Sequence, residues 1–184
     1  MEATEQPLKI ATPEVMQRIK DVIRDTATPS WLGSVPYNFG DAAAGKLKAD
    51  EWRTMFTLYL PIALVSLWGK GTSHPSTRVA TRLKDILDHT MSLVSAIILA
   101  CMRTTTRDRA EAYRICVATW VQGLKRHYPH IDDRTNNHMA FHIYDFLLLF
   151  GPVHSWWCFP FERLIGKLQR LPTNHKYGKL PIMY

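Results

Sequence analysis

STRVATRLKDILDHTMSLVSAIILACMR, residues 76 to 103, is the stretch that decides the fold of this chain. Ser76 or Thr77 offers a side-chain hydroxyl that can cap the start of a helix. Apolar residues then recur at helical spacing, which predicts one long amphipathic helix ending near Arg103. Its continuous apolar stripe consists of Val79, Leu83, Ile86, Leu87, Met91, Val94, Ile97 and Ile98.

Five further helices are predicted from the same periodicity and from capping signals. Pro61 lies inside the helix predicted over about residues 46–68 and should kink or break it. The helix predicted over residues 138–150 is apolar nearly all round and is therefore expected to be central. In chain order they cover 13 to about 25–27 (capped by Thr12), about 46–68, about 107–127, 138–150 (capped by Asn136 or Asn137), and a last helix ending at Pro172 with apolar Phe161, Leu164, Ile165 and Leu168.

The chain as a whole reads as all-α, since no stretch alternates apolar and polar residues long enough to be a strand. We expect a single domain over residues 1–184, a bundle of about six helices packed antiparallel through short connections. Residues 1–11 are expected to form a flexible tail. The loop at 30–45 holds three aromatic residues, which predict that it packs against the bundle.

Composition limits the compartment and the partners. The 184 residues carry a formal charge of +7, which is compatible with a polyanionic partner and equally with a basic, soluble protein that has no such partner. Three cysteines without a CxxC pair fit a reducing compartment, nucleus or cytoplasm. The polar N-terminus lacks a secretion signal, and the apolar runs 56–68 and 91–102 are shorter than the roughly 20 residues of a membrane span. We therefore expect neither secretion nor a membrane partner.

The stretch 151–177, GPVHSWWCFPFERLIGKLQRLPTNHKY, holds the candidate functional residues. Glu162 is the only acidic residue after Asp145, and it stands among aromatic and basic residues. The basic residues here are either phosphate contacts or a solvated helix face: Arg163, Lys167 and Arg170 on one side of the last helix, then Lys176 and Lys179. The aromatic residues expected to anchor this helix to the bundle are Trp156, Trp157, Phe159 and Phe161.

A second candidate site is the pair His138 and His142, four residues apart on one helix face. This spacing can hold a metal, with His154 or Cys158 as a further ligand, but the glutamate of an HExxH motif is absent. Packed or surface histidines are the alternative reading. The chain contains no Walker loop, no GxGxxG and no GxSxG turn.

Two segments together carry a family resemblance, GPVHSWWCFPFERLIGKLQ and GKLKADEWR. They resemble the C-terminal part of transposases of CACTA-like DNA transposons, most closely those of fungi, and the similarity extends over about residues 28–180. Such transposases have an RNase H-like fold in which three acidic residues bind two divalent metal ions. The resemblance implies that Glu162 is the third acid and that the preceding helices are a helical insertion.

The chain departs from that pattern because the first two acids should lie on β-strands, and none is predicted here. The resemblance therefore implies a transposase-derived helical domain that is non-catalytic alone and needs no cofactor. Its expected partner is DNA, a protein or a second copy of the chain. One alternative is a fragment of a strand-transfer enzyme, with Glu162 as a ligand for Mg²⁺ or Mn²⁺. The other is a purely structural or protein-interaction module.

Overall fold

A computed structural model describes residues 10–41, 44–132 and 134–170, without the side chains of Glu162 and Arg163. Every regular element in this part of the chain is helical, so the predicted all-α class is confirmed. The predicted tail, residues 1–11, falls almost wholly outside the described residues. The elements are α1 (Pro13–Asp25), α2 (Ala49–Thr54), the π-turn η2 (Met55–Tyr59), α3 (Leu60–Trp68), α4 (Thr77–Ala100), α5 (Arg107–His127), α6 (Thr135–Phe150), the 3₁₀ turn η3 (Val153–Ser155) and α7 (Phe159–Leu168).

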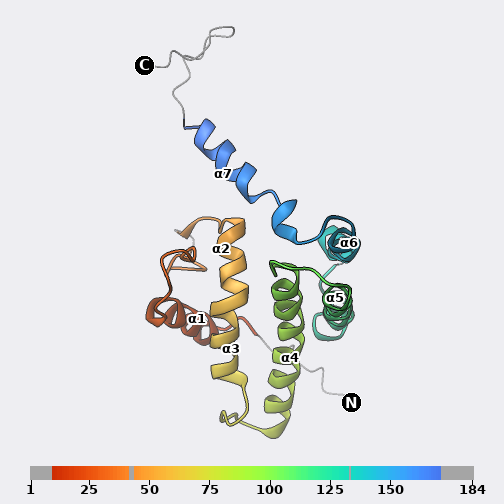
Figure 1. Cartoon of the computed structure of the whole chain (residues 1–184). Coiled ribbons are helices and arrows are strands. Elements are labelled where there is room, and N and C mark those ends of the chain that lie inside the picture. Colours follow the sequence, from red (N-terminus) through yellow and green to blue (C-terminus); the bar gives the residue numbers. More distant parts are fainter. Residues whose placement is uncertain (1–9, 42–43, 133, 171–184) are drawn as a thin grey trace.

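These elements form six helical rods, because α2, η2 and α3 follow one another without a break. Neighbours in sequence are neighbours in space: α1 packs on α3, α3 on α4, α4 on α5, and α5 on α6. Figure 1 shows α7 projecting from the end of the bundle at which α2 begins and α4 ends. No helix in the described residues is both long and apolar enough to cross a membrane.

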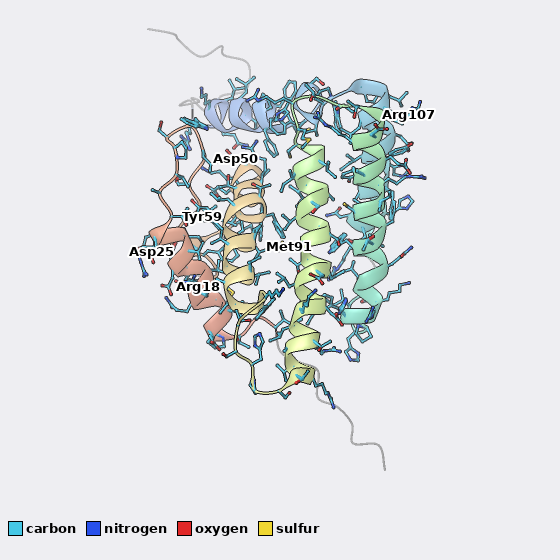
Figure 2. All side chains as sticks on the ribbon, turned by 60° about the horizontal axis from the view of Figure 1, so that its bottom comes forward. Arg18, Asp25, Asp50, Tyr59, Met91 and Arg107 are labelled. Atoms are coloured by element: carbon cyan, nitrogen blue, oxygen red, sulfur yellow. The ribbon has the colours of Figure 1, made fainter. Side chains whose placement is uncertain are left out.

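Helix α4 closes two separate hydrophobic cores with its two halves. Ile86 and Leu87 in its first half complete a core built by α1, η2 and α3. Ala96 and Ala100 in its second half join a core with α5 and α6. The small side chains at these positions allow α4 and α5 to approach closely. Figure 2 shows the α2–α3 rod, α4 and α5 side by side, with side chains filling the space between them.

The predicted helix starts are confirmed where a hydroxyl caps the helix. Thr12 accepts a hydrogen bond from the Val15 amide, and Ser76 accepts one from the Val79 amide. The ends are less well predicted: α4 ends at Ala100 rather than Arg103, and α6 begins at Thr135 without a capping asparagine. Helix ends depend on local hydrogen bonds that apolar periodicity does not encode.

Of the two predicted effects of Pro61, a kink or a break, the break does not occur. The chain stays helical from Ala49 to Trp68, and the turn before the proline widens to a π-turn in which the Leu60 amide reaches the Met55 carbonyl. A π-turn is one way to accommodate a residue that has no amide hydrogen. Met55 and Tyr59 on this turn are almost completely buried in the first core.

One packing prediction was wrong, and a second, that the aromatic residues of the 30–45 loop pack against the bundle, is confirmed only in part. Helix α6 is at the edge of the bundle, not central, and Leu147 is its one buried residue. A helix that is apolar all round can face an unoccupied interface as well as a core, and its sequence does not distinguish the two. In the 30–45 loop, Trp31 and Tyr37 are 85% and 73% exposed; Val35 and Phe39 supply the contact with the first core.

Candidate nucleic-acid interface

The segment between α6 and α7 is a structured stem. Gly151 ends α6 with φ of 77°, a conformation that residues other than glycine rarely adopt. The indole Nε1 of Trp156 donates a hydrogen bond to the Gly151 carbonyl at 3.1 Å. The same ring packs edge-on against Phe146 of α6, with centroids 5.7 Å apart. The stem therefore has a fixed start on α6.

Trp157 ties the end of the stem to the bundle. It lies 4.2 Å from the His154 ring and is stacked at 4.4 Å on Phe159, the first residue of α7. The guanidinium of Arg53, from α2, lies 5.5 Å from the Trp157 ring, within cation–π range. His154 in turn bonds the Cys101 carbonyl at the end of α4 at 2.8 Å. These contacts set the direction in which α7 leaves the bundle.

Three of the four predicted anchors make such contacts: Trp156, Trp157 and Phe159. Phe161 does not fit the prediction, because it is 65% exposed. It begins an apolar face on α7 whose other members are each more than half exposed: Leu164, Ile165 and Leu168. The aromatic residues thus hold the root of α7, and the body of the helix projects from the bundle, as Figure 1 shows.

The basic residues at the end of α7 flank this apolar face. Lys167 and the following Arg170 are both exposed; the position of Lys167 is about 60° around the helix from Leu164 and about 160° from Ile165, and Arg170 lies in the turn after the helix. Arg163 shares their register, but its side chain is outside the described part of the chain, as are Lys176 and Lys179. The two described cations are therefore accessible to a phosphate backbone.

The three-acid site of the resemblance depends on Glu162, whose side chain is also outside the described part of the chain. Its position lies in the first turn of α7, close to the stem. Among the described residues no group of three or more His, Cys, Asp and Glu side chains lies close enough to hold a metal ion. The role of Glu162 as a metal ligand stays a prediction.

The histidine pair on α6 has the expected geometry but no predicted third ligand. The Nε2 atoms of His138 and His142 are 3.1 Å apart on the exposed side of the helix. Of the proposed further ligands, His154 bonds to Cys101 as described above, and Cys158 is exposed at the start of α7. Asp145 is 3.9 Å from His142, which makes a weak surface ion pair when that histidine is charged.

A polar pocket between α4 and α5 was not predicted. It has a volume of about 370 Å³ and is lined by Asp85, His89, Arg126 and His127 among others. His89 is buried and its Nε2 lies 2.7 Å from the Trp120 carbonyl, so it donates this bond. The ring occupies space left by Gly123, where a Cβ would be 2.2 Å from the His89 Cδ2. A glycine inside a predicted helix was the available signal for such a close contact.

We expect folding stability to fall as the pH drops from about 7.5 to 5.5, with His127 as one cause. Burial, the neighbouring His89 and Arg126 lower the pKa of His127 below its ordinary 6.5, while Asp85 opposes them and Arg82 adds a smaller lowering effect. The unfolded chain therefore binds more protons, and stability is lost as the pH falls below 6.5 through the folded-state pKa. Urea midpoints across this range measure the effect.

His127→Gln is the control, since glutamine keeps a polar side chain that does not titrate. The variant should have a flatter dependence of the urea midpoint on pH than the wild type. If both proteins lose stability equally between pH 7.5 and 5.5, the depressed pKa of His127 is not a cause of that loss.

Comparison of the chain with protein-family models, with curated proteins and with solved structures found no significant match in any of the three.

Proposed function

We propose that this chain is a transposase-derived helical module, non-catalytic alone, that binds the phosphate backbone of duplex DNA through α7 and the basic residues after it. The observation that carries the proposal is the distribution of charge. Residues 153–184 hold five Lys/Arg and one Glu, so they contribute a net +4 to a chain of formal charge +7. More than half of the net charge thus lies in the last 32 residues.

The position of α7 supports the same proposal. The helix projects from the bundle (Figure 1), and Lys167 near its end and Arg170 in the following turn are both exposed. A phosphate backbone attracts cations whatever the base sequence, so such a surface needs no base-reading side chains. The resemblance to transposases makes duplex DNA the polyanion to test first.

The test is a fluorescence anisotropy titration of a labelled DNA duplex at low salt. Lys167→Gln combined with Arg170→Gln removes two charges from α7 and the turn that follows it and should weaken binding about tenfold. The matched control, Lys70→Gln with Arg82→Gln, removes the same charge from the α3–α4 loop and the start of α4. These positions are at the end of the bundle far from α7, so the control should bind as the wild type does (Figure 1). Absence of binding by the wild type at low salt would sink the proposal.

The alternative, a fragment of a strand-transfer enzyme, makes a different prediction. It requires nicking of DNA that depends on Mg²⁺ or Mn²⁺ and disappears in Glu162→Gln. The proposed module should bind DNA without nicking it under the same conditions. Metal-dependent nicking by the wild type that Glu162→Gln abolishes would favour the alternative.

A further inference from the structure

Helices α6 and α7 each present a largely exposed apolar surface. On α7 this is the face of Phe161, Leu164, Ile165 and Leu168, which are 52–65% exposed. On α6, Met139, Phe146 and Phe150 recur at spacings of seven and four, so they share one side of the helix. Leu149 borders this stripe and is 71% exposed. We call these the α7 face and the α6 face.

The two surfaces together are large enough for a stable interface between proteins. The exposed fractions of the eight side chains amount to more than four whole side chains. At about 200 Å² for each, one copy offers on the order of 900 Å² of apolar surface. A standard interface buries about 800 Å² on each partner. Isolated surface leucines need no explanation, but two apolar stripes of this combined area on consecutive helices indicate an interaction site.

The charges of the two helices differ in sign. Residues 135–150 contain one acid, Asp145, and no Lys or Arg. Residues 159–170 contain Arg163, Lys167 and Arg170 against Glu162. Contact between an α7 face and an α6 face therefore brings a basic segment beside an acidic helix, whereas contact between two α7 faces brings two basic segments together.

We propose that the occupant of both surfaces is a second copy of this chain, with the α7 face of each copy on the α6 face of the other. Each contact is then made twice about a two-fold axis, as in isologous dimers. Trp157, stacked on Phe159 and lying beside Arg53, holds the root of α7 in a fixed direction before association. That fixed root lowers the entropy cost of placing the helix on a partner.

The experiment is light scattering of the full chain after size exclusion, over a series of concentrations. The wild type should approach twice the chain mass of 21.2 kDa. Leu164→Ser with Leu168→Ser, on α7, should raise the dimer dissociation constant at least about a hundredfold. Leu149→Ser with Phe150→Ser, on α6, should do the same. The matched control, Val65→Ser with Ile115→Ser, changes two exposed residues of α3 and α5 and should stay dimeric.

Mixing the α7 variant with the α6 variant tests the reciprocal arrangement. The mixed pair keeps one intact contact, between the unchanged α7 face and the unchanged α6 face, so mixing should restore dimer that neither variant forms alone. Circular dichroism of each variant checks that the bundle is folded. A wild type that stays monomeric throughout the series overturns the proposal. So does a mixture that restores nothing, which is the result expected if two α7 faces pair with each other or a different protein covers them.

Discussion

Tyr113→Ala is expected to lower the free energy of unfolding by about 4 kcal/mol, because it removes a buried aromatic ring from the second core. Tyr113 is 3% exposed and packs among residues of α4, α5 and α6. Its hydroxyl donates a hydrogen bond of 2.7 Å to the Ala140 carbonyl, and burial raises the pKa of this phenol above its ordinary value. The ring therefore joins α6 to the bundle by packing and by a polar contact.

Urea unfolding followed by circular dichroism measures this loss. Two further variants serve to separate the contribution of the hydroxyl from that of the ring and to give the cost of a change at the surface of the same helix. Tyr113→Phe keeps the ring and removes only the hydroxyl, so its expected cost is about 1 kcal/mol. Ile115→Ala changes a 59% exposed side chain on the same helix and should cost less than about 0.5 kcal/mol. A Tyr113→Ala protein as stable as the Ile115→Ala protein would show that the second core does not hold α6 in place.

Gly123→Ala is expected to destabilise the fold by about 2 kcal/mol. In an ordinary helix interior the same substitution stabilises by about 1 kcal/mol, because glycine has low helix propensity. Here the new Cβ would lie 2.2 Å from the Cδ2 and 2.6 Å from the Nε2 of His89. That ring is buried and hydrogen-bonded to the Trp120 carbonyl, so moving it breaks the bond.

A double-mutant cycle with His89→Ala tests this explanation, because the change in stability caused by Gly123→Ala should reverse its sign when the His89 ring is absent. Once the ring is gone, Gly123→Ala should stabilise the protein by about 1 kcal/mol, as its helix propensity predicts. The same sign in both backgrounds would mean that Gly123 does not make room for His89. Gly123→Ala and His89→Ala leave the other residues of the pocket between α4 and α5 unchanged. The urea midpoints of the single and double variants are therefore directly comparable.

Helix positions were the part of the fold that the sequence predicts best. A stripe such as Leu83 to Val94 repeats over several turns, and hydroxyls at Thr12 and Ser76 mark the helix starts. Which faces meet was not predictable in the same way. The apolar faces of α6 and α7 have the pattern of core helices, yet Leu149 and Phe161 are exposed. Periodicity identifies an apolar side, but the partner of that side depends on the path of the connections.

The sequence indicated which residues make up the candidate site, but only part of how they are arranged in space. Lys167 and Arg170 are exposed, as a phosphate-binding face requires. Trp157 was predicted as an anchor, but its partner Arg53 is about a hundred residues away in sequence and no local pattern connects them. His89 was missed for a related reason, since its neighbours on α5 become visible only when α4 and α5 are packed together.

The salt dependence of DNA binding tests the proposed function most directly. Each phosphate contact steepens the dependence of log K on log salt concentration by about 0.9. Between about 50 and 200 mM salt, the Lys167→Gln and Arg170→Gln double variant should therefore have a slope shallower by about 1.8 than the wild type. The Lys70→Gln and Arg82→Gln control should keep the wild-type slope. Equal slopes for the wild type and the α7 variant would contradict the claim that α7 binds the DNA backbone.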